Sequence, residues 1–414
     1  IFLSVYIFFL QNNNNFFNIK DMKNILIGIT AGIAIYKIPN LIRLLRKNNF
    51  NVKIIMTPNA RRLINPIIFQ SLTNNKVYHK LFDNKDFDIE HISLARWADL
   101  IVIAPSTANT INKIANGIAD NLLLNVILST SAKILIVPAM NKNMYLNYIT
   151  QESIKKLKER GIYFLGPEEG ELACGEIGIG KMVNENLILE KIITLINKKN
   201  NLNNFKILIT AGACREKIDD VRFISNYSSG KQGYQIAKAA YLRGANVTLI
   251  SGYSTLEMPF LKIKKVESAE EMFNAVKSEI NKHDIFISAA AVSDFMPEKK
   301  INGKIKKEDL DKLEIKLKKT PDILSEIKDE KILKVGFAAE TENIIENGIK
   351  KLKNKKLNII VINDVSRNDI GFSSDYNQIT IITDREEKIE TERLSKFEIA
   401  NIILDCIVNY IKKR

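Results

Sequence analysis

Short apolar runs alternate with amphipathic segments along the first half of the chain, which predicts strands joined by helices. The runs are apolar throughout and do not alternate with polar positions. Strands of this kind are typical of a parallel sheet that helices cover on both faces. The pattern therefore predicts a doubly wound α/β domain with strands at residues 24–28, 51–56, 100–104 and 133–137.

The same alternation resumes after a polar, asparagine-rich tract at residues 198–204, which we interpret as a linker. A chain of 414 residues is also too long for one ordinary hydrophobic core. We predict two tandem parallel-sheet α/β domains, residues 22–197 and 205–414. The second is expected to be a Rossmann-like nucleotide domain with strands at residues 205–210, 246–251, 284–289, 334–337 and 358–362.

Residues 1–21 differ from the rest of the chain. An apolar run without a preceding basic region is followed by an asparagine tract, and the run is too short to span a bilayer. Met22 stands directly before the first predicted strand. We interpret residues 1–21 as a disordered or artefactual leader, with a membrane anchor as the less favoured alternative.

Composition narrows the functional classes further. Hydrophobic residues make up 46% and charged residues 26% of the chain, as in ordinary globular proteins. The formal net charge is +14, but the basic residues form no basic–aromatic stripe, so we expect no nucleic-acid partner and no membrane partner. Cys174, Cys214 and Cys406 form neither a disulfide framework nor a metal-binding spacing, which indicates a reducing cytoplasmic location and no protein metal site.

Small polar residues follow the predicted strands of the first domain. Ligands on parallel sheets bind beyond the carboxyl ends of the strands, and backbone amides at helix N-termini bind phosphate. The first turn lacks the spaced glycines of a dinucleotide fingerprint, so a mononucleotide such as FMN fits better than NAD. The candidate cofactor-binding residues are Gly28, Thr30, Ala31, Gly32, Thr57, Ser106, Thr107, Ala108, Asn109 and Met140.

The stretch from Val137 to Tyr145 has the least ordinary chemistry in the first half. Met140 and Met144 bracket Asn141, whose amide can both donate and accept hydrogen bonds. This combination suits a flat aromatic ligand with a small polar group beside it. The alternative is a strand end with two core methionines.

Two further residues of the first domain could take part in chemistry. His91 precedes the third predicted strand, where it could accept a proton or place positive charge beside a flavin ring; the alternative is a surface or core histidine. Cys174 lies in the glycine-rich stretch 170–182, which predicts a mobile flap over a site. The alternative there is a loop with an unreactive thiol.

These motifs occur together in a known order. The first turn, His91 and the stretches 104–109, 138–144 and 173–182 resemble the flavin-dependent phosphopantothenoylcysteine decarboxylases. The resemblance implies a flavodoxin-like flavoprotein domain in which FMN oxidises the substrate's CH2–SH group to a thioaldehyde, the electron sink for loss of carbon dioxide. By the same resemblance, His91 takes part in the oxidation or orients the substrate, Asn141 binds its carboxylate and amide, and Cys174 returns a proton to the enethiolate.

The first domain departs from the family pattern at two places. Thr30 and Ala31 stand where the family usually has serine and glycine, so a hydroxyl is kept and backbone freedom is reduced. Lys181 stands where the family usually has arginine, which keeps the charge but loses the planar guanidinium.

A second candidate site begins in the serine- and glycine-rich stretch before a helix that we expect to start near Tyr234. Hydroxyls and amides at such a point form an anion cradle, whose candidate residues are Ser228, Ser229, Gly230 and Lys231. The alternative is an ordinary serine–glycine turn. Polar stretches follow at residues 289–294, 304–307, 320–324 and 336–341, and then a lysine-rich helix.

These stretches resemble the CTP-using phosphopantothenate–cysteine ligases that are fused to the decarboxylase. The resemblance implies that Asn226 holds an acyl-cytidylate for the cysteine amine, that Lys304 is a flap lysine contacting it, and that Mg²⁺ bridges triphosphate oxygens. One departure is the stretch 210–216, where Ala213 and Cys214 replace a proline and a hydroxyl residue. The CTP contacts implied are Ala290, Asp294, Pro321, Asp322, Ile323, Leu324, Phe337, Lys351 and Lys355.

The two resemblances together predict a bifunctional enzyme of coenzyme A biosynthesis. Its ligase half joins 4′-phosphopantothenate to cysteine with CTP, and its FMN half decarboxylates the product to 4′-phosphopantetheine. The resemblance also implies a homo-oligomer with trimeric flavin domains and dimeric ligase domains. The alternatives are a non-catalytic flavin-binding regulatory subunit with a structural second domain, and an active flavin half joined to a structural dimerising half.

Overall fold

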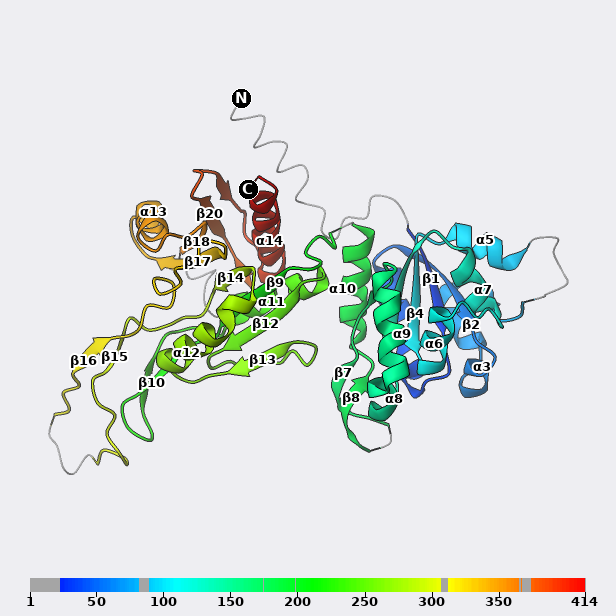
Figure 1. The fold of residues 1–414 in the computed structure, drawn as a ribbon, viewed down its shortest axis with the longest axis horizontal. Helices are drawn as coiled ribbons and strands as arrows, with labels where there is room; N and C mark the ends of the chain where they lie inside the picture. The colour runs from blue at the N-terminus through cyan, green and yellow to red at the C-terminus, as the bar shows by residue number, and fades with distance from the viewer. Residues whose placement is uncertain are drawn as a thin grey trace. The chain divides into compact units, whose positions relative to one another are not determined.

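The fold is described from a computed structural model, which defines residues 23–81, 89–173, 175–197, 199–306, 312–364, 366 and 374–413. The predicted leader at residues 1–21 and Cys174 lie outside these described residues. The chain divides into two compact units, residues 1–199 and 200–414, which are drawn in Figure 1 and described separately.

A parallel sheet forms the centre of the first unit (Figure 1). Among the described residues its strand order is β3-β2-β1-β4-β5-β6, so β2 and β3 lie on one side of β1 and β4, β5 and β6 lie on the other. Ile25 of β1 is in register with Val52 on one side and Leu100 on the other. The strands are β1 (Lys23–Ile29), β2 (Phe50–Met56), β3 (Val77–Tyr78), β4 (Leu100–Ser106), β5 (Lys133–Pro138) and β6 (Tyr163–Phe164), and an antiparallel hairpin follows with β7 (Glu168–Glu171) and β8 (Ile177–Lys181).

Helices cover both faces of this sheet. They are η1 (Ile33–Lys37), α2 (Ile38–Lys47), α3 (Ala60–Leu63), α4 (Ile67–Thr73), α5 (Glu90–Trp97), α6 (Ala108–Ala115), α7 (Leu122–Ser129), α8 (Lys142–Leu146), α9 (Tyr148–Glu159) and α10 (Glu185–Ile196). Leu26 and Ile101 pack beneath α5, α6, α7 and α9. Ile25 and Ile27 are equally buried on the opposite face, where α2 packs against α10. Because both faces are buried, the strands are apolar throughout, and the doubly wound prediction is confirmed.

The second unit repeats this architecture with two additional antiparallel strands. In its described part the strand order is β13-β12-β9-β14-β17-β18-β20-β21, and the strands from β13 to β18 are parallel. β20 and β21 extend the sheet in antiparallel pairing, so the sheet is mixed at one edge. The strands are β9 (Lys206–Ala211), β12 (Asn246–Ser251), β13 (Lys262–Lys265), β14 (Ile285–Ser288), β17 (Leu333–Glu340), β18 (Ile359–Asp364), β20 (Ile379–Thr383) and β21 (Lys388–Glu390).

Two pairs of helices bury the faces of the second sheet. Ile207 and Ile209 of β9 pack with α11 and α14, while Leu208 packs with α12 and α13 on the other face. The helices are α11 (Lys231–Leu242), α12 (Ala269–Glu279), η2 (Ile280–Lys282), α13 (Ile344–Asn354) and α14 (Lys396–Lys412). Small antiparallel pairs join β10 (Arg215–Lys217) to β11 (Phe223–Ser225), β15 (Phe295–Pro297) to β16 (Leu317–Lys319), and β19 (Tyr376–Asn377) to β22 (Leu394–Ser395).

Two segments differ in detail from the sequence expectation. Helix α11 begins at Lys231 and not near Tyr234, because Gly230 adopts a left-handed conformation (φ 77°) and caps the helix. In the stretch predicted as a linker, Leu202 is completely buried in the core of the second unit. Arg243, which is also buried, donates to the Asn201 side chain at 2.8 Å and so attaches this stretch to the unit.

None of the helices in the described ranges combines the length and the apolar character needed to cross a bilayer.

Candidate active sites

The first candidate site lies at the carboxyl ends of β1 and β4, where the strand order reverses. Hydrogen bonds join the two turns: the Thr30 hydroxyl donates to the Pro105 carbonyl at 2.7 Å, and the Thr107 amide donates to the Thr30 hydroxyl oxygen at 3.1 Å. The Thr57 amide donates to the Ile29 carbonyl at 3.0 Å and attaches the end of β2. A crevice at such a reversal is the general ligand position in open α/β sheets.

A cavity of about 350 Å³ opens beside these turns. Its size and its mixture of methionine, amide and small residues suit a flat ring. Gly32 lies against Pro105 on this wall, where an added Cβ atom would be in ordinary contact with the proline ring at 3.4 Å. The cavity brings together Ala31, Gly32, Thr107, Met140, Asn141 and Met144 from the sequence prediction, and adds Tyr36, Lys37, Gly180, Lys181 and Met182.

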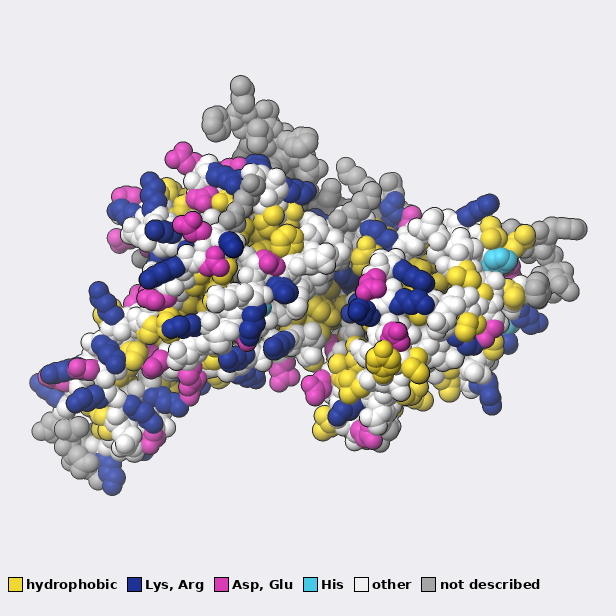
Figure 2. Space-filling model, in the orientation of Figure 1, with side chains coloured by type: hydrophobic (Ala, Val, Ile, Leu, Met, Phe, Trp, Pro, Cys, Tyr) yellow, Lys and Arg dark blue, Asp and Glu magenta, His cyan; other side chains and the backbone are white. Residues whose placement is uncertain are grey.

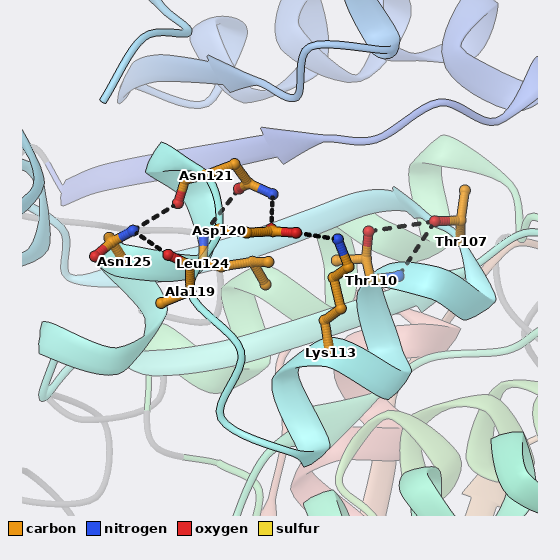
Figure 3. A network of polar contacts seen from close by, with 8 residues as sticks. All are labelled: Thr107, Thr110, Lys113, Ala119, Asp120, Asn121, Leu124 and Asn125. Atoms are coloured by element: carbon orange, nitrogen blue, oxygen red, sulfur yellow. Dashed lines mark hydrogen bonds and ion pairs between the residues drawn. The ribbon is translucent and has the colours of Figure 1, made fainter. Parts of the chain in front are cut away.

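A second cavity of about 180 Å³ shares Ala31 and Thr107 with the first. Hydroxyl and amide groups dominate its lining, which is the chemistry that binds a phosphate. The Thr107 hydroxyl caps α6 by accepting from the Thr110 amide, and Figure 3 shows both threonines beside the Lys113 side chain. The lining contains the predicted residues Thr30, Thr57 and Asn109 together with Asn59, Thr110, Lys113, Asp120 and Asn121.

The hairpin of β7 and β8 closes one side of the larger cavity. The Met140 amide donates to the Gly180 carbonyl at 3.0 Å, and the Asn141 side chain donates to the Glu176 carboxylate at 3.1 Å. Asn141 also caps α8, because its side-chain oxygen accepts from the Asn143 amide at 2.8 Å. The residue predicted to bind the substrate carboxylate is therefore held from both sides by the chain around it.

Several residues predicted for the first site do not line either cavity. Gly28 lies within β1, where a Cβ atom would meet the Leu123 side chain at 2.5 Å, so its small size serves packing. Ser106 and Ala108 are buried behind the turns. His91 lies on α5, which Figure 1 shows on the opposite side of the unit from α8.

The second candidate site is the turn before α11. The Ser228 amide donates to the Asn226 carbonyl at 2.8 Å, and the Gly230 and Lys231 amides lie 3.3 Å and 3.4 Å from the Ser228 and Ser229 hydroxyl oxygens. These contacts curl the stretch so that amides and hydroxyls gather at the helix N-terminus, the arrangement that an anion requires.

Positive charge accompanies this turn. Lys231 forms an ion pair with Asp375 at 2.7 Å, and the Lys396 amide donates to the Asp375 carbonyl at 2.9 Å. Burial, and then the neighbouring charge of Lys231, lowers the pKa of Lys396 to about 8. Lys396 lies on a helix, 165 positions after Lys231 in the chain, so no local pattern in the sequence connects the two residues.

The backbone around Lys304 is attached to the loop that precedes Asn226. Asp219 is buried, and its carboxylate accepts from the Ile305 amide at 3.1 Å, while Asp220 accepts from the Gly303 amide at 2.8 Å. Burial opposes ionisation of Asp219, but hydrogen bonds from three backbone amides outweigh it and keep its pKa below the ordinary value. The side chain of Lys304 is exposed between these two anchored positions.

A third group of predicted residues gathers at the carboxyl end of β17. The Lys351 ammonium donates to the Phe337 carbonyl at 2.8 Å, and Lys355 pairs with Asp322 at 3.1 Å. Burial, followed by the charge of Lys355, lowers the pKa of Lys351. Lys351 of α13 and Lys355, which follows the helix, therefore lie at the turn of residues 321–324 that was predicted to contact a nucleotide.

The end of β14 meets the same turn. The Thr320 amide donates to the Asp294 carbonyl at 3.0 Å, and the Ala290 amide lies 3.4 Å from the hydroxyl oxygen of Thr210 near the end of β9. Because β9 and β14 are the pair at which this sheet reverses its strand order, the position corresponds to the crevice of the first unit.

Cys214 does not belong to the chemistry of this site. Its side chain is buried, and it lies 3.9 Å from the Met272 sulfur. Burial, and then the charges of Glu216 and Glu271, raise the pKa of its thiol to about 12. The thiol therefore acts as a small core residue.

Comparison with known proteins matches each half of the chain to a protein family. Residues 18–197 match the Flavoprotein family, and residues 202–411 match the C-terminal domain of the DNA/pantothenate metabolism flavoproteins. The "Coenzyme A biosynthesis bifunctional protein CoaBC" of Vibrio vulnificus (strain CMCP6) is 42% identical over 372 residues, which cover 88% of this chain and 92% of that relative.

Other relatives agree. The protein of the same name from Escherichia coli (strain K12) is 40% identical over 394 residues, 93% of this chain and 97% of that relative. The crystal structure of the C-terminal domain of a CoaBC protein is 40% identical, covers 52% of this chain and 100% of that chain, and has a TM-score of 0.45. With such identity over nearly the full length of the relatives, this chain belongs to the family of bifunctional coenzyme A biosynthesis proteins called CoaBC.

Proposed function

We propose that the chain is a bifunctional enzyme that makes phosphopantothenoylcysteine and then decarboxylates it. The second unit joins 4′-phosphopantothenate to cysteine at the expense of CTP, through an acyl-cytidylate. The first unit converts the product to 4′-phosphopantetheine with FMN. The observation that carries the proposal is family membership over both units. In each unit several of the candidate residues lie at the point where the strand order of the sheet reverses.

In the first unit the lining of the two cavities fits FMN. The larger cavity offers Met140, Gly32 and Asn141 to a flat ring, and the smaller one offers the Thr57 hydroxyl and the Asn109 amide to a phosphate. When bound, FMN would take two electrons from the substrate's thiol carbon, which makes that carbon an electron sink, and would return the same two electrons once carbon dioxide has left. Asn141 binds the substrate carboxylate, and Cys174 supplies the proton that completes the product.

In the second unit the charged residues suit a triphosphate. Lys351 and Lys355 stand at the turn 321–324, and the curled turn at 226–231 offers amides to the phosphate of 4′-phosphopantothenate or of the intermediate. Asn226 holds the acyl-cytidylate while the cysteine amine displaces CMP, and the exposed Lys304 approaches from its anchored segment. Mg²⁺ would arrive with the triphosphate and neutralise part of its charge, as is usual for this ion in phosphate sites.

Assembly of the flavin domains into a trimer would explain why His91 does not line the cavities of its own protomer. Exposed apolar side chains gather over α8 and the β7–β8 hairpin (Figure 2), among them Leu146, Tyr148 and Ile177. In a trimer of flavin domains, this surface is covered by the neighbouring protomer, whose α5 brings its own His91 to the cavity.

The number of chains per particle tests the assembly. If the flavin domains form trimers, native mass spectrometry of the purified protein should give a particle whose chain number is divisible by three. If the ligase domains also pair, that number should be even. A monomeric particle that is fully active would show that His91 needs no neighbouring protomer.

The overall reaction is tested by supplying the purified protein with 4′-phosphopantothenate, cysteine, CTP and Mg²⁺. We expect release of pyrophosphate, CMP and carbon dioxide, with 4′-phosphopantetheine as the product. Omitting CTP should stop the formation of all four products. Supplying phosphopantothenoylcysteine in place of CTP should restore carbon dioxide and 4′-phosphopantetheine, but neither pyrophosphate nor CMP. If carbon dioxide is released from supplied phosphopantothenoylcysteine but no pyrophosphate is formed from CTP, the result would support the function of the first unit and contradict that of the second.

A further inference from the structure

The smaller cavity of the first unit contains an ion pair that the function proposed above does not yet use. Lys113 of α6 donates to the carboxylate of Asp120, and both side chains line the cavity. Lys113 and Asp120 are the two charged residues among the described residues that line the cavity. The other polar groups of the lining are hydroxyls, side-chain amides and backbone atoms. Figure 3 shows the Lys113 ammonium between Asp120 and Thr110.

The loop that carries Asp120 is built to hold this carboxylate in place. The Asn125 side chain donates to the Ala119 carbonyl at 2.8 Å and to the Asn121 carbonyl at 3.0 Å. The Asn121 side chain donates to one Asp120 oxygen at 3.0 Å and accepts from the Leu124 amide at 3.1 Å, so it also caps α7. One carboxylate oxygen is thus oriented by Asn121, and the other receives Lys113 (Figure 3).

The direction of the Lys113 side chain follows from its position on α6. Side chains on a helix tilt toward its N-terminus, so a lysine at residue 113 extends back toward Thr110 and Thr107 at the start of the helix. Its side chain is only 26% exposed, and the Asp120 contact keeps the ammonium at the cavity and out of bulk water. Little conformational entropy remains to be lost when an anion arrives.

Lys113 supplies the positive charge of the cavity lining. A phosphate monoester carries nearly two negative charges at neutral pH, and Asp120 adds another at the same wall. Hydroxyls and amides can donate hydrogen bonds to such an anion but cannot neutralise it. An ammonium has three donors, so Lys113 can keep its bond to Asp120 and donate to a phosphate at the same time.

We propose that Lys113, oriented by Asp120, binds the terminal phosphate of FMN and gives the site its preference for FMN over riboflavin. The proposal rests on FMN being the flavin of the first unit. Asp120 is a positioning residue, because it acts through Lys113. The clamped loop between α6 and α7 makes the cation part of the site before the flavin binds.

The test compares two flavins that differ only in the phosphate. Full-length protein freed of flavin is titrated with FMN and with riboflavin, and binding is followed by quenching of flavin fluorescence. For Lys113→Gln we expect the Kd for FMN to rise about 10- to 100-fold, the usual loss for a charge-assisted hydrogen bond. The Kd for riboflavin should not change, which also shows that the variant is folded.

Two further variants separate the effect of the charge at residue 113 from the effect of the protein's overall positive charge. Lys155→Gln removes an exposed lysine of α9 and should leave both affinities as in the native protein. Lys113→Arg keeps the charge and should retain part of the preference for FMN. The native protein should also bind FMN less tightly as salt rises, and Lys113→Gln should show a weaker salt dependence.

The outcomes distinguish a failure of the proposed flavin-binding function from a failure of the role proposed for Lys113. If the native protein binds neither flavin, the proposed function of the first unit fails. If it binds FMN well and Lys113→Gln binds FMN equally well, or loses both flavins to the same extent, only the role of Lys113 is overturned. A native protein without preference between FMN and riboflavin would overturn it as well.

Discussion

Gly180→Ala is expected to remove flavin binding from the first unit. Gly180 has φ 149°, and an added Cβ atom would lie 2.1 Å from the Met140 carbonyl oxygen, which belongs to the backbone and cannot rotate away. The unusual backbone conformation costs about 1–3 kcal/mol for a residue other than glycine, before this overlap is relieved. Strand β8 must therefore move away from the turn at residues 139–141, which opens the cavity wall.

The measurement is the flavin absorbance of the purified variant and its release of carbon dioxide from phosphopantothenoylcysteine. We expect both to fall at least tenfold, a loss of about 1.4 kcal/mol or more. Pyrophosphate release should continue, because the ligase residues lie in the other compact unit.

A matched control lies two residues earlier in the same strand. At Gly178 an added Cβ atom would meet only the flexible side chain of Lys142, which can move aside, so Gly178→Ala should bind flavin normally. A Gly180→Ala protein as yellow and as active as the native one would show that β8 does not shape the cavity.

Lys351→Met should weaken the use of CTP more than any other single change on α13. Lys351 is half-buried and donates to the Phe337 carbonyl at 2.8 Å, and burial lowers its pKa, so its charge lies in a partly desolvated place. An interaction between a triphosphate and such a charge contributes about 3 kcal/mol. The KM for CTP should rise roughly a hundredfold.

This effect is measured as pyrophosphate release against CTP concentration. Lys353→Met is the control, because Lys353 lies on the same helix, carries the same charge and is exposed. It should leave the KM for CTP unchanged. Equal values for the two variants would mean that α13 acts through its general positive charge, and that Lys351 has no particular contact with the nucleotide.

Candidate residues in the turns after predicted strands could be recognised from the sequence more completely than residues elsewhere in the chain that line the same cavity. Thr30, Thr57 and Asn109 follow strands whose carboxyl ends could be recognised from their apolar runs, and the structure brings them to one cavity. Lys113 and Asp120 are not among the predicted site residues. The sequence carries a signal for each: Lys113 follows the polar turn at residues 104–109 by one helical turn, and Asp120 belongs to an Asp-Asn pair before an apolar helix.

His91 shows a different kind of limit. The sequence places it before a strand of the first domain, but in one protomer it lies on α5, which does not line either cavity. Its role in the reaction stays a prediction that depends on a neighbouring chain. A residue supplied by another subunit leaves no local pattern by which its partner could be recognised.

The sequence by itself determined the central parallel strands of both sheets and the polar turns at their carboxyl ends, because the burial of both sheet faces requires uninterrupted apolar runs and leaves the turns polar. It did not indicate the short edge strands β3, β6 and β13 or the antiparallel strands β20 and β21. Only the tertiary structure decided which turns meet: Thr30 with Thr107, 77 positions apart, and Asp219 with Ile305, 86 positions apart. Apolar periodicity reports whether a residue is buried, whereas the choice of partner depends on strand order and register, which arise when the whole sheet assembles.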